Sequence, residues 1–233
     1  MKAMILAAGE GRRMRPLTEN VPKPLLEVAG RPLIEHHLLR LSAAGYQEVV
    51  VNVSYFGDQL RAFLGNGDRW GLKIQISAEL APLETAGGII QALPLLGKEP
   101  FLLVNSDIYT DYPFEKLRNT RLPVRGAHLV MVPNPPHHPK GDFLLEGNRC
   151  IGSDNESSGK IELSTLRHVT YAGIARFDPI FFSRVRPGRR PLRPLLDRAI
   201  IEELVSGELF EGMWVDVGTP ERLEACNHLF PKG

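Results

Sequence analysis

The 233-residue chain carries 28 lysines and arginines against 27 aspartates and glutamates, which gives a formal charge of +1. This balance excludes the broad basic surface that nucleic acids and anionic membranes need, so an anionic substrate must be held by a few individually placed cations. With 43% hydrophobic and 24% charged residues, the chain can bury the core of one large α/β domain or of two lobes that share a sheet.

The N-terminus and the cysteines indicate where the protein works. The apolar residues 1–8 are followed directly by Gly9 and charged residues, so this segment is too short for a signal peptide or a membrane span. Cys150 and Cys226 form no CxxC pair and are expected to be reduced, partly buried residues. We therefore expect a cytoplasmic protein.

Short apolar runs alternate with helical patterns in the first half of the chain. Residues 3–7 form an apolar run bounded by a glycine, which predicts a strand buried on both faces of a parallel sheet. Residues 32–44 place leucines on one side of a helix that ends near Gly45. The same reasoning predicts strands at 48–52, 73–77 and 101–104 and helices at 57–64 and 85–93, the second of these ended by Pro94.

This alternation loosens after about Asp111. The later pattern predicts strands at 127–132, 169–177 and 214–217, a Pro/His-rich loop at 133–139, a hairpin over 143–151 that turns at Gly147-Asn148, a mobile loop at 154–160, a helix at 192–204 and a last helix opened by Thr219-Pro220. Alternating strands and helices are typical of an α/β fold. We expect a Rossmann-like, mixed but mostly parallel central sheet flanked by helices.

The strongest local signal is the loop after the first strand. It contains two glycines and three arginines: Gly9, Gly11, Arg12, Arg13 and Arg15. Glycines let backbone N–H groups approach a phosphate, and arginines add bidentate hydrogen bonds. A tight turn with solvated arginines is the alternative. Met14 stands where a GxGxxG fingerprint needs its third glycine, and no GxxxxGK[ST] occurs, which disfavours a dinucleotide or P-loop site.

Three further residues point to phosphate chemistry. Lys23 lies between two prolines, which hold it in an extended segment and lower the entropy cost of aiming it at a ligand. Asp107 follows the strand 101–104, and Asp216 lies in the strand 214–217. Mg²⁺ prefers one or two carboxylates together with phosphate oxygens, so the two aspartates predict a magnesium site. A helix cap for Asp107 and a turn for Asp216 are the alternatives.

These segments together resemble the sugar-1-phosphate nucleotidyltransferase family. The resemblance rests on GEGRRMRPLT, PKPLL, LETAGG, NSD, GDF and WVDVGT, which occur in the family's order over nearly the whole chain. It implies a GT-A-like fold with a small sugar-binding lobe. It also implies one domain over 1–233, with nucleotide bound mainly by residues 1–110 and sugar mainly by 111–233. The implied partners are a nucleoside triphosphate and a sugar 1-phosphate, with Mg²⁺ as cofactor.

The resemblance also implies a mechanism without a covalent intermediate. An oxygen of the sugar phosphate attacks the α-phosphorus of the triphosphate, and pyrophosphate leaves. Arg13 matches the arginine that grips the triphosphate, and Lys23 matches the lysine that offsets charge on the reacting phosphates. Asp107 and Asp216 match the magnesium ligands. These four are the expected catalytic residues.

Base and sugar recognition are carried over position by position. The expected nucleotide-binding residues are Leu6, Ala7, Gly9, Gly11, Arg12, Arg13, Lys23, Glu79 and Gly88. Glu79 stands where many relatives have glutamine, and its carboxylate can accept from N3–H of uracil or from guanine. The alternative is a solvated carboxylate. The expected sugar-binding residues are Glu84, Asn105, Gly141, Asp142, Thr170 and Gly173.

One departure concerns the sugar phosphate. Relatives commonly carry an E-K-P segment whose lysine holds this group, and no such tripeptide occurs here. Lys160 lies in the corresponding region but is followed by Ile161-Glu162. The remaining candidates for neutralising the sugar phosphate are Arg12, Arg15, Lys140 or a second metal ion.

Several activities remain open. Short length, the LETAGG and WVDVGT segments, and the run from His137 to Phe143 are most similar to members that use UTP and N-acetylmuramate 1-phosphate in bacterial cell-wall recycling. His137 and His138 would suit contacts near a sugar carboxylate, although histidines in such a loop can simply be exposed. The alternatives are a mannose-1-phosphate guanylyltransferase and, from another class, a non-catalytic nucleotide-sugar sensor. We expect a monomer or a small homo-oligomer.

Overall fold

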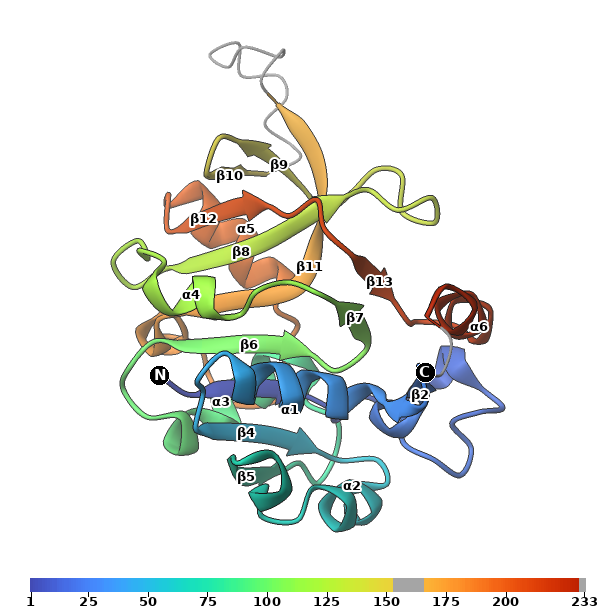
Figure 1. Cartoon of the computed structure of the whole chain (residues 1–233). Coiled ribbons are helices and arrows are strands. Elements are labelled where there is room, and N and C mark those ends of the chain that lie inside the picture. The colour runs from blue at the N-terminus through green and yellow to red at the C-terminus, as the bar shows by residue number, and fades with distance from the viewer. Residues whose placement is uncertain (153–165, 231–233) are drawn as a thin grey trace.

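A single nine-stranded sheet forms the centre of the molecule. The computed structural model describes residues 1–152 and 166–230, so the predicted loop at 154–160 and Lys160 lie outside the described residues. The strands follow the order β5-β4-β1-β6-β11-β8-β12-β10-β9, and Figure 1 shows this sheet running from β5 at the bottom to the β9–β10 hairpin at the top.

The strands of this sheet are β1 (Ala3–Leu6), β4 (Glu48–Val53), β5 (Lys73–Ala78), β6 (Phe101–Asn105), β8 (Ala127–Pro133), β9 (Phe143–Glu146), β10 (Arg149–Ile151), β11 (Arg167–Phe177) and β12 (Val205–Leu209). Two small pairs are β2 (Glu27–Val28) with β3 (Arg31–Pro32), and β7 (Ile108–Thr110) with β13 (Trp214–Asp216). The α-helices are α1 (Leu33–Ala43), α2 (Gly57–Leu64), α3 (Glu84–Leu96), α4 (Glu115–Asn119), α5 (Arg193–Ile201) and α6 (Pro220–Leu229).

The sheet is parallel in its first half and mixed in its second. β5, β4, β1 and β6 pair in parallel. β11 is antiparallel to β6, β8 and β9, whereas β12 is parallel to β8. The expectation of a mostly parallel sheet therefore holds for the first half and is wrong for the second, where β11 enters against the direction of its neighbours.

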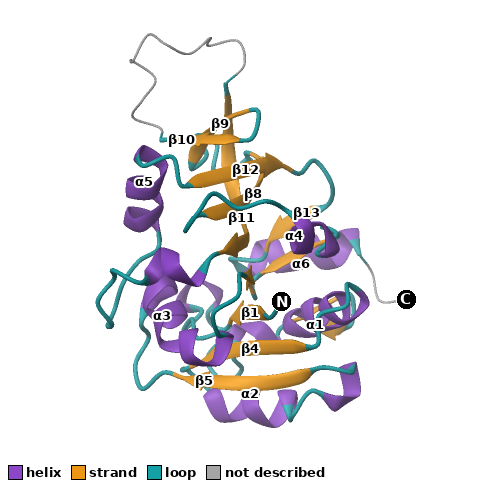
Figure 2. Cartoon of the chain, turned by 90° about the vertical axis from the view of Figure 1, so that its left-hand side faces the viewer, coloured by secondary structure: helices purple, strands orange, loops and turns teal. Residues whose placement is uncertain are grey.

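Helices cover both faces of the sheet, which explains why the central strands are apolar without alternation. Figure 2 shows α3 and α5 on one side and α1 on the other. Ile5 of β1 packs in the core under α1 and α2, while its neighbour Met4 packs in the core under α3 and α5. Because successive side chains of a strand point to opposite faces, both kinds of position must be apolar.

Helix α3 continues past the point at which it was expected to end. Pro94 lies inside the helix, which reaches Leu96. Proline removes one helical hydrogen bond, but Ala86, Ile89 and Ala92 form a buried face that Leu96 extends. Packing of this last turn outweighs the lost bond, and Gly97, at a φ of 89°, provides the turn that ends the helix.

The predicted helix over 192–204 is shorter than expected and is followed by a strand. It ends at Ile201, Glu203 adopts a φ of 57°, and β12 begins at Val205. The VSGEL sequence of β12 carries no apolar run. Gly207 is needed there because a Cβ would lie 2.7 Å from the Sγ of Cys150. By contrast, the hairpin at Gly147 is confirmed, with Arg149 opposite Glu146.

The core also contains a buried histidine. His37 of α1 is 1% exposed, and burial, followed by the neighbouring His36, lowers the pKa of His37 from 6.5 to about 4. The folded state therefore keeps this ring neutral at a pH where the unfolded state protonates it. Its stabilising contribution is complete above about pH 6.5 and is lost as the pH falls toward 4.

We expect the free energy of unfolding to fall by about 2 kcal/mol between pH 7.5 and pH 5 through His37 alone. Urea unfolding of the protein and of a His37→Leu variant at both pH values measures this effect. Burial also lowers the pKa of His128, but that residue is present in both proteins and cancels in the comparison. An equal loss of stability in the two proteins would contradict the assignment.

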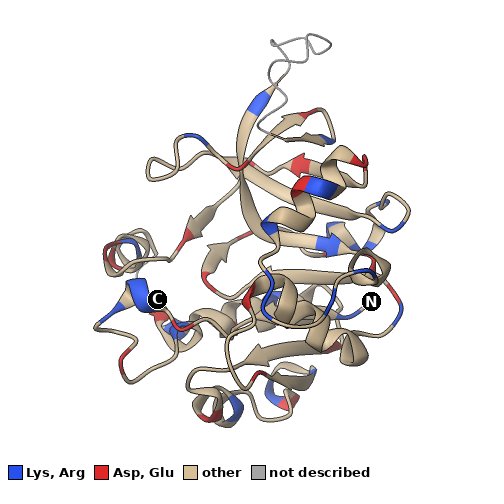
Figure 3. Ribbon diagram, turned by 180° about the vertical axis from the view of Figure 1, so that it is seen from behind, with Lys and Arg blue, Asp and Glu red and all other residues tan. Residues whose placement is uncertain are grey.

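Over the chain as a whole, lysines and arginines nearly balance aspartates and glutamates. On the face seen in Figure 3, basic and acidic segments are interspersed along the ribbon. Within residues 1–152 and 166–230, no helix combines the length and the apolar character needed to cross a bilayer. Cys150 and Cys226 are both free and buried, as expected.

Candidate active site

The candidate site lies near the carboxyl ends of three adjacent parallel strands. Leu6 ends β1, and it is in register with Asn52 of β4 on one side and with Asn105 of β6 on the other. Ligands bind at this edge of open α/β sheets because the strands stop there and the following loops diverge. The edge therefore brings polar groups from distant parts of the sequence together.

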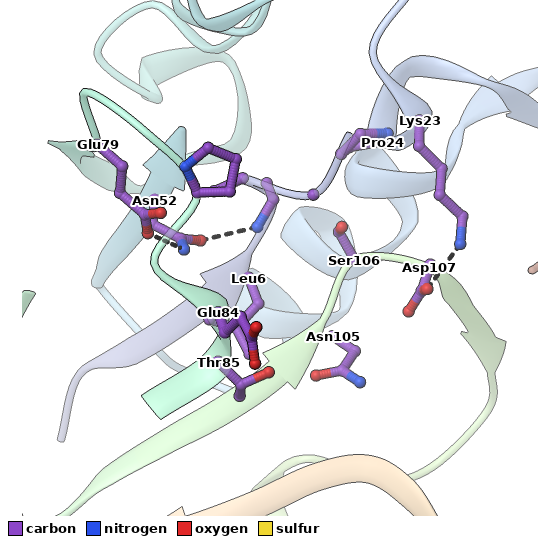
Figure 4. Close-up of a pocket in the computed structure, with 14 residues that line it drawn as sticks. Leu6, Lys23, Pro24, Asn52, Glu79, Glu84, Thr85, Asn105, Ser106 and Asp107 are labelled. Atoms are coloured by element: carbon purple, nitrogen blue, oxygen red, sulfur yellow. Dashed lines mark hydrogen bonds and ion pairs between the residues drawn. The ribbon is translucent and has the colours of Figure 1, made fainter. Parts of the chain in front are cut away.

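A first pocket of about 290 Å³ opens at this edge. Figure 4 shows side chains from β1, β4 and β6 and from the loops that follow them pointing into it. The pocket is lined by Leu6, Ala7, Ala8, Gly9, Lys23, Pro24, Asn52, Glu79, Pro82, Glu84, Thr85, Asn105, Ser106 and Asp107. One end is closed by the carboxylate of Glu79, and the other contains the ion pair of Lys23 with Asp107.

A chain of hydrogen bonds fixes Glu79. The backbone N–H of Ala7 donates to Asn52 Oδ1 at 2.8 Å, and Asn52 Nδ2 donates to Glu79 Oε1 at 2.7 Å. Glu79 Oε2 accepts from the backbone N–H of Leu83 at 2.9 Å. Glu79 is only 7% exposed, so it is not the solvated carboxylate of the alternative interpretation. It presents acceptors in a fixed place.

Gly88 of α3 borders this network without lining the pocket. A Cβ there would lie 2.6 Å from Glu79 Oε1 and 2.7 Å from Asn52 Nδ2. Glycine is thus required by close packing against the Glu79–Asn52 hydrogen bond. Close packing against this hydrogen bond gives Gly88 a role other than direct contact with a nucleotide.

We expect Gly88→Ala to raise KM for the triphosphate about tenfold, equivalent to about 1.4 kcal/mol of binding. The added methyl group displaces Glu79, whereas alanine favours the helix by about 1 kcal/mol, so the fold should persist. Steady-state kinetics and thermal unfolding measure the two effects. The control is Gly152→Ala, where no described residue lies within 4 Å of the added Cβ. An unchanged KM would contradict the packing argument.

Residues of the first loop differ in whether they reach a pocket. Arg12 is exposed and pairs with Glu10, whose pKa is lowered by this hydrogen bond. Arg13 lines a second pocket. Gly11 lines neither pocket; at a φ of 64°, a Cβ there would lie 3.0 Å from Thr18 Cγ2 and 3.2 Å from Lys23 Cβ. Gly11 therefore makes room for the lysine.

Lys23 forms an ion pair with Asp107, one of the two predicted magnesium ligands. Its Nζ lies 2.6 Å from Asp107 Oδ2, and the lysine side chain is 11% exposed against 32% for the aspartate. The following Pro24 is buried and begins a turn with Lys23. The lysine is therefore held at the point where its charge is available to both a carboxylate and an incoming phosphate.

A second pocket of about 380 Å³ adjoins the first. It is lined by Arg13, Asn105, Asp107, Ile108, His137, His138, Asp142, Thr170, Tyr171, Ala172, Gly173, Trp214, Asp216 and Arg222. Asn105 and Asp107 line both pockets. Burial raises the pKa of Tyr171, which therefore stays neutral. A ligand spanning the two pockets would pass Asn105 and Asp107.

The two predicted magnesium ligands lie side by side across the β7–β13 pair. Ile108 is paired with Asp216, and the backbone N–H of Val217 donates to the carbonyl of Asp107 at 2.9 Å. Asp216 Oδ2 lies 3.1 Å from Arg222 Nη1 and 3.4 Å from His137 Nε2. Asp107 therefore faces Lys23, and Asp216 faces Arg222.

One wall of the second pocket is built from the loop 133–142 and from β11. Asp142 Oδ1 lies 3.1 Å from His138 Nε2, and Asp142 Oδ2 accepts from the backbone N–H of Tyr171 at 2.8 Å. Gly173 adopts a φ of 75° at a bulge in β11, where a Cβ would lie 2.7 Å from Asn105 Nδ2. The glycine lets β11 approach the shared wall of both pockets.

The structure brings most of the predicted residues together. The first pocket contains Leu6, Ala7, Gly9, Lys23, Glu79 and Glu84, the second contains Arg13, Asp142, Thr170, Gly173 and Asp216, and both contain Asn105 and Asp107. Four predicted residues line neither: Gly11, Arg12, Gly88 and Gly141. At Gly141, with a φ of 66°, a Cβ would lie 2.5 Å from Asn134 Oδ1, so this glycine shapes the loop.

Two functional candidates were missed from the sequence. Asn52 follows the apolar residues 49–51 as Asn105 follows the apolar residues 101–104, and this position near the carboxyl end of a strand was an available signal. Arg222 lies one turn into α6, where its guanidinium contacts Asp216. No local pattern indicates its role, although Gly218 leaves space for its guanidinium, since a Cβ there would lie 2.1 Å from Arg222 Nη2.

The chain is similar to known sugar-1-phosphate nucleotidyltransferases. An N-acetylmuramate α-1-phosphate uridylyltransferase of Neisseria meningitidis serogroup B is 46% identical over 98% of each chain. A mannose-1-phosphate guanyltransferase of Aspergillus fumigatus is 33% identical over 95% of this chain, which spans 62% of that protein. A solved structure described as a glucose-1-phosphate thymidylyltransferase from Bacillus anthracis shares the fold, with a TM-score of 0.79, 20% identity and coverage of 99% of this chain and 95% of that chain.

The family assignment rests on sequence over most of the chain. The family model described as nucleotidyl transferase matches residues 2–141. This range contains the glycine- and arginine-rich loop, the PKP segment and Asp107. The 46% identical relative extends the match to the C-terminal residues that carry Asp216. The resemblance stated from the motifs is confirmed: the chain belongs to the nucleotidyl transferase family.

Proposed function

We propose that the protein transfers a uridylyl group from UTP to N-acetylmuramate 1-phosphate, giving UDP-N-acetylmuramate and pyrophosphate. The observation that carries this proposal is the shared wall of the two pockets, where Asn105 and Asp107 line both. Such a wall allows two substrates to meet at their phosphates. The choice of substrates rests on the 46% identical uridylyltransferase, which covers both chains almost completely. Cell-wall recycling is the corresponding role.

The two halves of the chain divide the binding work in this proposal. Residues 1–110 hold the nucleotide in the first pocket, with Glu79 accepting from N3–H of uracil. Residues 111–233 provide most of the second pocket and bind the sugar. Within the mixed α/β fold, the second half forms the sugar-binding lobe of a Rossmann-like, GT-A-like domain. A cytoplasmic, monomeric or small oligomeric protein that binds neither nucleic acid nor membrane fits this role.

The chemistry is a single in-line displacement. A phosphate oxygen of the sugar 1-phosphate forms a bond to the α-phosphorus, and the bond from that phosphorus to the bridging oxygen breaks as pyrophosphate leaves with the electron pair. The attacking oxygen is already ionised, so no general base is needed. Arg13 and Lys23 supply positive charge where charge accumulates, and positioning supplies the rest of the rate.

The residues at the shared wall fit Mg²⁺. Among the described residues, no group of three or more His, Cys, Asp or Glu side chains could enclose a metal ion. Mg²⁺ does not need such a cage, because it takes one or two carboxylates and completes its shell with phosphates and water. Asp216 ends β13, and Asp107 directly precedes β7, the strand that pairs with β13. When bound there, the ion neutralises phosphate charge and orients the reacting groups.

Relatives commonly hold the sugar phosphate with the lysine of an E-K-P segment, which this sequence lacks. Arg222 is our candidate for the cation that binds the sugar phosphate instead. The earlier candidates Arg12, Arg15 and Lys140 line neither pocket. Arg222 lines the second pocket, with a side chain that is 19% exposed. A guanidinium there can bind phosphate through two parallel N–H groups once Asp216 takes another partner. His137 and His138 line the same pocket and are placed to contact a sugar carboxylate.

A guanylyltransferase is the second candidate within the family. The 33% identical guanyltransferase supports it, and the two oxygens of Glu79 could accept from N1–H and the amino group of guanine. A non-catalytic sensor is the alternative from another class. The lysine, arginine and two aspartates around Asn105 argue against a sensor, since binding alone does not need them all.

We expect Glu79→Gln to raise KM for UTP about tenfold, equivalent to about 1.4 kcal/mol. Both oxygens of Glu79 already accept internal hydrogen bonds, from Asn52 and Leu83. Glutamine would turn one acceptor into a donor that faces another donor. Steady-state kinetics with UTP measures the effect, and Glu99→Gln at an exposed position is the control. Unchanged binding of UTP would contradict the role given to this network.

The proposal is tested by identifying the product. We incubate the purified chain with Mg²⁺, UTP and N-acetylmuramate 1-phosphate, and analyse the mixture by mass spectrometry. The mass of UDP-N-acetylmuramate, formed with one pyrophosphate per molecule, is the expected result. Folded protein that binds both substrates and forms no product would instead favour the sensor.

A further inference from the structure

A third pocket lies away from the two described above. It has a volume of about 610 Å³ and shares no lining residue with either of them. It is formed by the segment 180–190, helix α5 and the residues just after it, together with Arg125. Figure 3 shows this face, with blue basic segments along the chain that leads into α5 and on α5 itself. We name it the arginine pocket.

The arginine pocket concentrates positive charge. Its lining contains one carboxylate, Glu202, and five arginines: Arg125, Arg184, Arg186, Arg190 and Arg198. The lining therefore has a formal charge of +4 in a chain whose total is +1, so the remainder of the chain is net acidic. Such local concentration of one sign of charge attracts anions from solution.

Several of these arginines have no carboxylate partner. Arg198 pairs with Glu202 at 2.9 Å. Among the described residues, Arg125, Arg184 and Arg186 make no ion pair. Three guanidiniums at one pocket are therefore available for a ligand, and each can bind a phosphate through two parallel N–H groups.

Apart from the arginines, Glu202 and Ser183, the lining is apolar. The side chains concerned are Ile180, Phe181, Val185, Leu195, Ala199 and Leu204. Ile180 is 48% exposed, although isoleucine is usually buried in folded proteins. A pocket of several hundred Å³ with an apolar lining and a few charged groups is typical of an organic ligand rather than of an inorganic ion.

The segment that carries the arginines is anchored. The carbonyl of Arg190 accepts from the N–H groups of Ala86 and Gly87 at 3.0 and 3.1 Å, and the N–H of Arg190 donates to the carbonyl of Leu83 at 2.8 Å. Gly87 permits this contact, because a Cβ there would lie 2.4 Å from the carbonyl oxygen of Gly188. The pocket wall is thus pre-organised, which lowers the entropy cost of binding.

We propose that the arginine pocket is a second ligand site, for an organic diphosphate with an aromatic or apolar part, and that a nucleoside diphosphate is the class it takes. Two adjacent phosphates match the three unpaired guanidiniums of Arg125, Arg184 and Arg186. The base and ribose match the apolar lining. No chemical step occurs there.

Binding stoichiometry tests this site. We titrate UDP into the full chain by isothermal calorimetry without Mg²⁺, and repeat the titration with Arg184→Ala/Arg186→Ala and with Lys23→Met. We expect two UDP molecules per wild-type chain. The double arginine variant should lose or weaken one of them at least about tenfold, and Lys23→Met should weaken the other. Arg61→Ala, an exposed arginine of α2, is the matched control and should retain both.

Pyrophosphate release by the double arginine variant shows that it is folded, because Arg184 and Arg186 line neither pocket of the active site. Identical UDP binding by the wild-type protein and this folded variant overturns the proposal. Sedimentation with phosphatidylglycerol vesicles is the second arm. Vesicle binding that requires Arg184 and Arg186, without any difference in UDP binding, would assign the charge to a membrane surface and overturn the proposal as well.

Discussion

Lys23→Met is expected to lower kcat/KM for nucleotidyl transfer by about 10²–10³-fold, the range found when one electrostatic group is removed from a transition state. Lys23 is 11% exposed and lies 2.6 Å from Asp107, at the wall shared by the two pockets. Charge builds on the phosphates there during the reaction, and a mostly buried ammonium stabilises it more strongly than solvent does. Initial rates of pyrophosphate release at varied UTP and sugar phosphate measure the loss.

Two variants sharpen this result. Lys23→Arg keeps the positive charge and should therefore recover part of the activity that Lys23→Met loses. If the lysine served only to pack the loop, retaining its charge would not be expected to restore activity. Lys73→Met removes an exposed lysine at the first residue of β5, the end of that strand opposite to the pocket, and should leave the rate within a factor of about two, because salt screens exposed charges. A rate for folded Lys23→Met within threefold of wild type would contradict the role of the lysine.

Asp107→Asn and Asp216→Asn are each expected to lower kcat by about 10²-fold or more. Both side chains line the second pocket; Asp107 directly precedes β7, in which Ile108 pairs with Asp216 of β13. Asparagine keeps the shape of the side chain but removes the charge that Mg²⁺ prefers. We expect removal of Mg²⁺ by EDTA to abolish the reaction, and we expect higher Mg²⁺ to restore part of the rate of the Asp216 variant.

The double variant tests whether the two aspartates bind the same metal ion or act separately. If both aspartates serve the same ion, Asp107→Asn/Asp216→Asn should lose little more activity than the worse single variant, because residues that act as a unit are not additive. Losses that multiply would show that the two carboxylates act separately. Asp58→Asn, on the solvent side of α2, is the control and should retain wild-type kinetics.

The sequence predicts the first half of the fold well for a physical reason. Strands such as β4 and β6 are covered by helices on both faces, so they appear as unbroken apolar runs that local patterns reveal. β12 could not be found in this way. Its VSGEL sequence is a strand because Gly207 fits against Cys150 and because β8 offers a partner. Both contacts are made by residues far away in the chain.

The same distinction, between local sequence patterns and contacts with distant residues, applies to the site residues. Lys23 and Asp107 could be predicted because prolines and an apolar strand mark their positions in the sequence. Local patterns could not predict which of the three loop arginines faces a pocket, because that depends on the turn at Arg12–Met14, which buries Met14; only the family resemblance indicated Arg13. Arg222 could not be predicted either. Its contact with Asp216 depends on how α6 packs after Gly218.

Glycines were the least predictable part of the site. Gly9 lines the first pocket, whereas Gly11 and Gly88 make room for Lys23 and Glu79. All three were assigned to nucleotide binding from the motifs. A glycine in a motif marks a close approach of two groups. Only the structure identifies whether the second group is a ligand or another part of the protein.

The most direct test of the central claim is a matrix of pyrophosphate release with Mg²⁺. It combines UTP, GTP, dTTP, CTP and ATP with the 1-phosphates of N-acetylmuramate, N-acetylglucosamine, glucose and mannose, and it compares kcat/KM for each pair. The account predicts that UTP with N-acetylmuramate 1-phosphate exceeds every other pair. A preference for GTP with mannose 1-phosphate would contradict the uridylyltransferase assignment, and no release from any pair by folded protein would contradict catalysis itself.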